Sequence, residues 1–278
     1  MRPAQPLDLD RRVIDGTVGP LVSAETGEGP TILLVHGAPG TIRDFRWLTP
    51  MLSTWARVIV VDMPGYGLSH PTRFPATLGG RTAYLSEILD VHGVKRCVAI
   101  GHSFGSWAVA NLGLREPERV LGVGMISPVG ISMHQGLKRF RIRQLFKLRH
   151  LAPFREPLLT ILHRGFSRSG FPGAEVHDVE RVLDVLDAMD FEAYAEVVES
   201  LRTPVWLVHC EDDPLIEEAI VLELIHALSD RDYLTLAAGG HNPQRDFAIE
   251  LAASLQHWVI SRGFFGEPPL GANGRIAG

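Results

Sequence analysis

Short apolar runs recur along the chain and are separated by longer runs with helical spacing. The apolar runs consist of β-branched and leucine residues without alternating polar positions, a pattern typical of strands that helices cover on both faces. Strand runs interleaved with helical runs predict a parallel sheet between two layers of helices, which is the α/β class of fold. The runs expected to form buried strands are 31–35, 57–61, 96–100, 120–126, 205–209 and 233–236.

The pattern also predicts how the chain is divided. Residues 12–15 and 19–23 have strand composition and predict an N-terminal hairpin. Residues 128–203 carry only helical patterns and interrupt a sheet that resumes afterwards, so we expect an inserted helical cap there. The α/β core then comprises residues 1–127 and 204–262. The tail, 263–278, is rich in glycine and proline and is expected to be disordered.

The two halves of the expected cap have opposite charge. The second half is acidic, whereas Glu156 is the single acid among the basic residues of the first half. We interpret this as basic and acidic helices that face and neutralise each other. A peripheral contact of the basic half with anionic lipid is the alternative. The basic residues concerned are Lys138, Arg139, Arg141, Arg143, Lys147, Arg149, Arg155, Arg164 and Arg168.

Composition narrows the class of protein. The 278 residues are 45% hydrophobic and 21% charged, as in an ordinary globular protein. A net charge of −5 argues against general nucleic-acid binding. No apolar run reaches the roughly 18 residues of a membrane span, and the N-terminus has no signal core, so a cytoplasmic protein is expected. Cys97 and Cys210 fit reduced core thiols, and the pattern predicts neither metal nor cofactor.

A G-x-S-x-G motif at 101–105 lies between a strand run and the helical run 107–112. A serine at such a turn occupies a sharp, strained bend that lifts its hydroxyl out of the sheet. The flanking Gly101 and Gly105 are needed because side chains there would collide with the neighbouring strand and helix. Ser103 is therefore the candidate nucleophile, and it needs a base and an acid that orients the base.

The chain resembles an α/β-hydrolase of the capped, cofactor-free kind over nearly its whole length apart from both tails. The resemblance implies a mostly parallel central sheet flanked by helices, an inserted helical cap, and a Ser-His-Asp triad in the chain order Ser, Asp, His. The segments that carry the resemblance are His36-Gly37-Ala38-Pro39-Gly40, Asp62-Met63-Pro64-Gly65-Tyr66-Gly67-Leu68-Ser69, the Ser103 motif, Glu211-Asp212-Asp213 and Gly239-Gly240-His241.

Three carboxylates, at 211–213, follow the strand run that ends at His209. Active sites of open α/β sheets form at such carboxyl ends of strands. The resemblance places the triad acid four residues after this histidine, at Asp213, with Asp212 as the alternative. Some relatives carry the acid after the preceding strand, but that position holds no carboxylate here, since it reads 127–128, Ser-Pro.

His241 is the candidate base. It follows the last strand run and two glycines, and it lies after both Ser103 and Asp213, as the order of this triad requires. His36 and His102 belong to the motifs, but they fall where backbone packing is the usual role. Most of the other histidines lie on expected helices, which are those of the cap for His134, His150, His163 and His177 and those of the core for His92, His226 and His257.

The resemblance also implies where an oxyanion would bind. One donor is the backbone N–H of Phe104, next to the nucleophile, and the other comes from the loop 36–40. Pro39 has no N–H, which leaves Ala38 as the second donor. The loop 62–69 resembles a structural motif of the family, and we assign it no catalytic role.

The residues at and around the candidate triad exclude some of the reactions that the family catalyses. Epoxide hydrolases and haloalkane dehalogenases of the family use a carboxylate nucleophile and dienelactone hydrolases use a cysteine, whereas Ser103 stands here. Carbon–carbon bond hydrolases often have tryptophan after the catalytic histidine, where this chain has Asn242. Proline iminopeptidases resemble the chain in the oxyanion loop but differ at 62–65 and around the serine.

What remains is a carboxylic ester hydrolase for a small molecule with a small or medium, partly hydrophobic acyl group. Aminopeptidases of the proline-iminopeptidase type, carbon–carbon bond hydrolases and acyltransferases are the alternatives, as is a receptor that keeps the triad. Phe104 and Trp107 suggest an apolar substrate pocket, and cap arginines offer a site for a substrate carboxylate. The apolar cap stripe either lines this pocket or only packs on the core: Leu137, Phe140, Leu145, Leu148 and Leu151.

Overall fold

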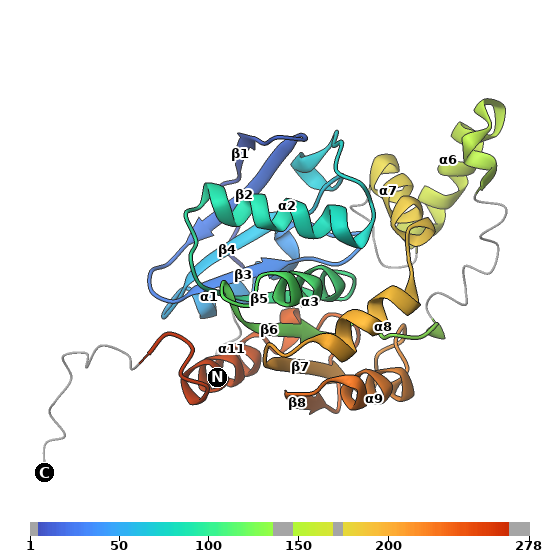
Figure 1. Cartoon of the computed structure of the whole chain (residues 1–278). Coiled ribbons are helices and arrows are strands. Elements are labelled where there is room, and N and C mark those ends of the chain that lie inside the picture. The colour runs from blue at the N-terminus through green and yellow to red at the C-terminus, as the bar shows by residue number, and fades with distance from the viewer. Residues whose placement is uncertain (1–4, 136–146, 169–174, 267–278) are drawn as a thin grey trace, which may run out of the picture.

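The computed structural model (Figure 1) describes residues 5–135, 147–168 and 175–266. The centre of the molecule is a sheet with the strand order β1-β2-β4-β3-β5-β6-β7-β8. β2 pairs antiparallel with both β1 and β4, and every later pair is parallel. The α/β fold with a mostly parallel sheet is therefore confirmed.

The strands form where the sequence pattern predicts them, with ends that differ by at most two residues except at β2, which extends three residues further than expected. β3, β5 and β7 are buried at every position, because they lie in the middle of the sheet under helices on both faces. The strands are β1 Arg12–Asp15, β2 Pro20–Thr26, β3 Thr31–Val35, β4 Arg57–Asp62, β5 Cys97–His102, β6 Val120–Ile126, β7 Val205–Cys210 and β8 Arg231–Leu236.

Helices cover both faces of this sheet and enclose two apolar clusters. Residues of α2, α3 and α9 contribute to one cluster, and residues of α1 and α11 contribute to the other. The helices of the core are α1 Leu48–Leu52, α2 Leu78–Val91, α3 Gly105–Arg115, α9 Glu218–Ala227, α10 Pro243–Asp246 and α11 Ala248–Ser261, with short 3-10 turns η1 Ile42–Phe45 and η2 Gly67–Ser69.

The described residues between β6 and β7 form helices and no strand. They comprise η3 Lys147–His150, α6 Ala152–Arg168, α7 Val176–Asp187 and α8 Phe191–Ser200. In Figure 1, α6 and α7 lie beside the core, and α8 runs back toward α3. Tyr194 of α8 stacks on Trp107 of α3, with ring centroids 4.1 Å apart. This contact joins the inserted helices to the core.

Ion pairs connect the basic and acidic halves of the inserted segment. Buried Arg149 contacts Asp184 at 3.1 Å and Asp187 at 2.7 Å, and Arg155 contacts Glu180 at 2.7 Å. These contacts are the arrangement expected if the two halves neutralise each other. The predicted basic and apolar cap residues that lie outside the described part are Lys138, Arg139, Arg141, Arg143, Leu137, Phe140 and Leu145.

The core extends further than the sequence pattern indicates. The expected tail begins at residue 263, but Phe264 is 8% exposed and packs against Trp258, with ring centroids 5.0 Å apart. Its carbonyl accepts a hydrogen bond from Arg96 at 2.7 Å. The aromatic side chain therefore belongs to the core, and 267–278 lie outside the described residues. Within the described helices, none is both long and apolar enough to cross a membrane.

Candidate active site

Ser103 stands at the turn between β5 and α3. Its backbone φ is +51°, in the left-handed region that is strained for a residue with a side chain. A Cβ at Gly101 would collide with the backbone of Gly105, and a Cβ at Gly105 would collide with the carbonyl of Val35. The two glycines thus let the helix approach the sheet closely enough to form the bend.

Three side chains from separate strand ends meet at this bend. His241 Nε2 lies 2.9 Å from Ser103 Oγ, and His241 Nδ1 lies 2.8 Å from Asp213 Oδ2. Because a carboxylate only accepts, Nδ1 carries the hydrogen and donates to Asp213. Nε2 is then free to accept the hydrogen of the Ser103 hydroxyl. The structure therefore brings together the three residues that the sequence selects.

Asp213 is held in its charged form. Burial by itself favours the neutral carboxyl, but the hydrogen bond and charge of His241, with backbone N–H groups of Leu215 and Ile216, lower the pKa of Asp213. The two N–H groups donate to Oδ1 at 2.8 and 3.1 Å, which leaves Oδ2 for the imidazole. The acid is thus both ionised and fixed in direction at neutral pH.

Asp212, the alternative acid, has a different position. Its exposed carboxylate accepts hydrogen bonds from the backbone N–H groups of Gly240 at 2.7 Å and Gly239 at 3.3 Å. Both glycines have positive φ and form the turn that leads to His241. The geometry therefore favours Asp213 as the partner of the imidazole, and Asp212 shapes the loop that carries it.

The loop after β3 passes directly beside the nucleophile. A Cβ at Gly37 would lie 3.0 Å from Ser103 Cβ. Within the described chain, the N–H groups of Ala38 and Phe104 donate no hydrogen bond. Two free N–H groups next to a nucleophile are the donors that an oxyanion would need.

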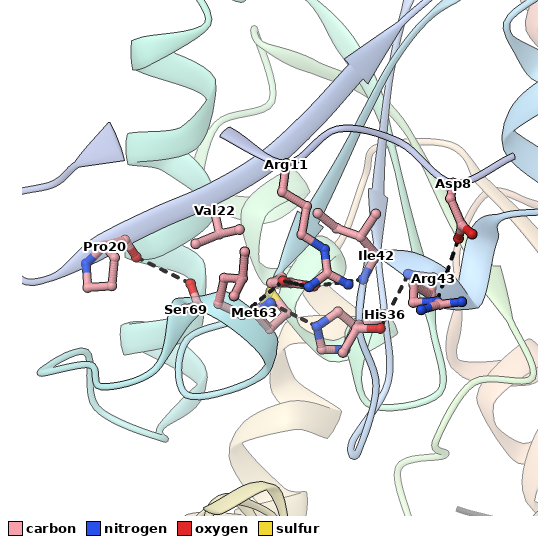
Figure 2. A network of polar contacts seen from close by, with 12 residues as sticks. Asp8, Arg11, Pro20, Val22, His36, Ile42, Arg43, Met63 and Ser69 are labelled. Carbon is pink, nitrogen blue, oxygen red and sulfur yellow. Dashed lines mark hydrogen bonds and ion pairs between the residues drawn. The ribbon is translucent and has the colours of Figure 1, made fainter. Parts of the chain in front are cut away.

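His36 and the loop after β4 support this arrangement, as Figure 2 shows. His36 Nε2 accepts from the backbone N–H of Met63 at 2.8 Å, so Nδ1 carries the hydrogen and donates to the Gly37 carbonyl at 2.6 Å. Burial lowers the pKa of His36, which keeps the ring neutral. Sequence reasoning assigned His36 to backbone packing, and the structure shows which backbone groups it joins.

The same network contains a buried carboxylate, that of Asp62. Asp62 is fully buried and accepts from the backbone N–H of Ile42 at 2.8 Å and of Leu68 at 3.1 Å. Arg11 lies in the segment before β1, and its Nη1 is 3.5 Å from the Asp62 carboxylate (Figure 2). A Cβ at Gly67 would collide with this carboxylate, so the glycine is required there. The loop after β4 is therefore structural, in agreement with its expected role.

His102 has a positioning contact that sequence reasoning missed. Its Nε2 lies 2.7 Å from the backbone carbonyl of His241, so Nε2–H is the donor. Burial lowers the pKa of His102 to about 3, and the ring is therefore neutral at ordinary pH. The contact joins residues 139 positions apart, and nothing local in the sequence indicates it.

Trp107 lies on α3, with its indole 1% exposed. Its Nε1 donates to the Val129 carbonyl at 3.1 Å, and its ring contacts Tyr194 and Phe191. The side chain therefore packs the inserted helices against the core and is not brought into contact with the triad. Its role as a substrate contact stays a prediction.

A cavity of about 710 Å³ opens beside the oxyanion loop. Pro39 and Gly40 of that loop border it, as does Asn242, the residue after the candidate base. The same cavity contacts Asp44 of η1, whose pKa burial raises to about 7. The cavity thus borders both the oxyanion loop and the loop that follows His241.

A serine, an imidazole and a carboxylate thus lie in one hydrogen-bonded series at the strand ends of an α/β sheet. The same series occurs in the class of proteins that activate a serine for attack. The family model described as the alpha/beta hydrolase family matches residues 32–254. This range is most of the chain, and the chain therefore belongs to the α/β hydrolase family.

Curated relatives match parts of the chain. The chain is 32% identical to the dihydrolipoyllysine-residue acetyltransferase component of the acetoin cleaving system of Cupriavidus necator over 104 residues, which is 37% of this chain and 28% of that protein. It is 34% identical to a 2-hydroxy-6-oxo-2,4-heptadienoate hydrolase of Pseudomonas putida over 112 residues, 39% of this chain and 41% of that one. The chain thus spans less than half the length of either relative.

Solved structures share the whole fold at low identity. A haloalkane dehalogenase loop variant from Bradyrhizobium elkanii superposes with a TM-score of 0.72 at 18% identity, covering 92% of this chain and 98% of that structure. At this identity the comparison supports the architecture and leaves the reaction to the residues of the site.

Proposed function

We propose that this protein is a serine hydrolase that cleaves a carboxylic ester through an acyl-enzyme, with Ser103, His241 and Asp213 as its triad. The observation that carries the proposal is the continuous series of hydrogen bonds from Asp213 Oδ2 through His241 to Ser103 Oγ. A serine hydroxyl is a weak nucleophile by itself, and an adjacent oriented base is what activates it.

The first half of the reaction forms the acyl-enzyme. Ser103 Oγ attacks the ester carbonyl carbon while His241 Nε2 takes the hydroxyl proton. Asp213 stabilises the resulting imidazolium, and the N–H groups of Ala38 and Phe104 bind the oxyanion. When the tetrahedral intermediate collapses, the carbon–oxygen bond of the ester breaks and the imidazolium gives its proton to the leaving alcohol.

The second half repeats these steps with water. His241 takes a proton from water as the water oxygen attacks the acyl carbon. Collapse of the second intermediate releases the carboxylic acid and returns the proton to Ser103 Oγ. An acyltransferase would use the same acyl-enzyme with an alcohol or amine in place of water. A proline-iminopeptidase-type enzyme would begin from an amide, and a carbon–carbon bond hydrolase from a ketone.

A serine-reactive fluorophosphonate tests the proposal. We expect labelling of the wild-type protein at Ser103, located by mass spectrometry of the digested adduct, and no labelling of Ser103→Ala. Ser53→Ala, which removes a hydroxyl at the end of α1, is the matched control and should label like the wild type. Labelling at another residue, or equal labelling of Ser103→Ala, would refute the assignment.

A series of p-nitrophenyl esters and anilides of increasing acyl length then separates the alternatives. Ester turnover that Ser103→Ala abolishes supports hydrolysis, and preferential anilide turnover supports a peptidase. Slow hydrolysis with fast transfer to an added alcohol or amine identifies an acyltransferase. A single turnover that leaves His241 modified identifies a receptor.

A further inference from the structure

Arg81, near the start of α2, is a buried cation without an acidic partner. It is 6% exposed, and among the residues that the structure describes no carboxylate lies within ion-pair distance of it. Its Nη1 donates to the Phe104 carbonyl at 3.3 Å, and its Nε has no hydrogen-bond partner. Buried charges are normally paired, because an unpaired one keeps the full cost of leaving water.

Two buried phenols are further candidate donors. Tyr66 and Tyr194 are 2% and 0% exposed, and neither hydroxyl makes a hydrogen bond within the described chain. The Ser106 hydroxyl donates to the Ser103 carbonyl, and its oxygen lies near the Tyr194 hydroxyl as an acceptor. Burial raises the pKa of both phenols, so both keep their hydrogen and remain donors. Arg81 binds the Phe104 carbonyl, the Phe104 ring lies edge-on to Trp107 with centroids 6.4 Å apart, and Trp107 stacks on Tyr194, so Arg81 and Tyr194 lie in one region.

This region adjoins the candidate active site. The Tyr66 ring lies edge-on to His36 of the oxyanion loop, with centroids 5.5 Å apart. The Tyr194 ring stacks on Trp107, four residues after the nucleophile, and Arg81 itself binds the residue next to the nucleophile. Arg81 and Tyr194 therefore lie where α8 meets the core, and Tyr66 lies beside the oxyanion loop.

A second cation strengthens the positive potential there. Arg181 of α7 donates to the carbonyls of Pro64 at 2.8 Å and Phe74 at 3.0 Å, and it forms no ion pair in the described ranges. A Cβ at Gly65 would lie 2.7 Å from its Cδ, so this glycine permits the close approach. The charge of Arg181 acts on both Tyr66 and Arg81. Arg181, which is partly buried, therefore lies against the backbone next to Tyr66 and adds positive charge on that side.

We propose that Arg81, Tyr66 and Tyr194 form a subsite for a carboxylate on the acyl part of the substrate, so that the enzyme hydrolyses monoesters of dicarboxylic acids. This inference rests on the proposed ester hydrolysis. A carboxylate pairs with a guanidinium in two parallel hydrogen bonds, and phenol hydroxyls can donate to its remaining lone pairs.

The geometry assigns the carboxylate to the acyl part and not to the leaving group. His241 must reach the leaving oxygen to protonate it, so the leaving group lies on the side of the histidine loop. The subsite contacts His36, Phe104 and Trp107 instead, on the side of the oxyanion loop and α3.

Matched esters test the inference. We expect the wild type to have a kcat/KM for mono-p-nitrophenyl glutarate at least about tenfold above that for p-nitrophenyl pentanoate, since only the glutarate ester can form charge-assisted hydrogen bonds in the subsite. Arg81→Met should lower this ratio about tenfold or more, chiefly through KM, and Arg81→Lys should restore part of it. Arg231→Met, at an exposed position of β8, is the control and should keep the wild-type ratio.

Three results would overturn the inference. They are equal use of both esters by the wild type, an unchanged ratio in Arg81→Met, and a parallel loss of both activities, which would mean that Arg81 only supports Phe104. If Arg81→Met fails to fold, Tyr194→Phe and Tyr66→Phe remove one hydroxyl each and must lower the ratio by themselves.

Glutarate binding separates this inference from the proposed reaction. Calorimetry with Ser103→Ala should detect glutarate, and Ser103→Ala/Arg81→Met should not. If binding depends on Arg81 but no ester is hydrolysed, the subsite stands and the proposed reaction fails. If esters are hydrolysed but Ser103→Ala does not bind glutarate, the subsite fails and the reaction stands.

Discussion

His241 is positioned by three neighbours that lie far from one another in the sequence. Asp213 binds its Nδ1 at 2.8 Å, and His102 donates to its backbone carbonyl at 2.7 Å. Asp212 accepts a hydrogen bond at 2.7 Å from the N–H of Gly240, which precedes His241 in the chain. One neighbour therefore orients the ring and two hold the backbone, so their substitutions should have different consequences.

Asp213→Asn should lower kcat for the best ester by about 10⁴-fold, because the amide no longer stabilises the imidazolium or fixes the required tautomer. Asp212→Asn keeps one oxygen to accept from Gly240 N–H, loses the longer contact with Gly239 and should lower kcat far less. Steady-state kinetics of the two variants measure this contrast. A loss of equal size in both would mean that the acid has been assigned to the wrong aspartate.

His102→Ala should lower kcat by about tenfold with little change in KM, because the lost hydrogen bond loosens the loop that carries His241. His102→Gln can donate from a similar reach and should recover part of the loss. The rate of fluorophosphonate labelling should follow kcat in both variants. If KM rises while labelling is unchanged, His102 acts on substrate binding and not on the position of the base.

Asp44 should give the protein an unusual dependence of stability on pH. Burial raises its pKa from 3.8 to about 7, so the folded state favours the neutral carboxyl. The stability that this group contributes is complete below about pH 3.8 and is lost as the pH rises through about 7. Asp44→Asn should therefore gain unfolding free energy relative to the wild type between pH 5 and 8. Denaturant titrations measure the unfolding free energy of both proteins. A difference between them that stays the same from pH 5 to pH 8 would contradict this prediction.

At the scale of the element, the close approach of α3 to the sheet determines the nucleophile turn. Gly105→Ala places a methyl group against the Val35 carbonyl, and we expect it to lower the unfolding free energy by about 2 kcal/mol or more. Gly79→Ala in α2 meets no atom within 4 Å and should stabilise the protein by about 0.5–1 kcal/mol. Urea unfolding of both variants provides the test. Equal effects would show that close approach is not the reason for Gly105.

Most elements could be predicted from the sequence because their causes are local. The buried strands have continuous apolar runs, and the Ser103 turn has two glycines that the approach of helix to sheet requires. The end of the core was predicted wrongly by a few residues. Phe264 follows a glycine at the start of a Gly/Pro-rich segment, and only the tertiary contact with Trp258 explains its burial.

The supporting contacts of the site could not be predicted because they join distant segments. His102 and His241 are 139 positions apart, and His36 and Met63 are 27 positions apart. The sequence also does not indicate that Arg81 lacks an acidic partner among the described residues, because this depends on where every acidic side chain lies in the fold. The candidate triad residues have motif signals, and His36 and His102 also lie in the motifs, but the motifs do not indicate which backbone groups these two rings contact.

At the scale of the whole molecule, the inserted helices are attached to the core by buried contacts. Tyr194 stacks on Trp107, and Arg181 binds the carbonyls of Pro64 and Phe74. Within the insertion, Arg149 joins the basic segment to α7 through two aspartates. Since the proposed carboxylate subsite draws donors from both parts, its geometry depends on how these helices are held.

Arg149→Met should lower the unfolding free energy by about 2 kcal/mol, because a buried cation with two charged hydrogen bonds is lost and two aspartates are left close together. Arg155→Met removes an exposed ion pair and should cause no measurable change. Thermal and denaturant unfolding of the two variants compare them. Equal destabilisation would show that burial does not distinguish these pairs.

Rapid-quench mass spectrometry during turnover of a p-nitrophenyl ester tests the whole account most directly. We expect a burst of about one equivalent of p-nitrophenol per protein and an acyl group on the peptide that contains Ser103. Both should be absent from Ser103→Ala and strongly slowed in His241→Ala. Release of p-nitrophenol with the acyl group on another residue, or unchanged release by Ser103→Ala, would contradict it.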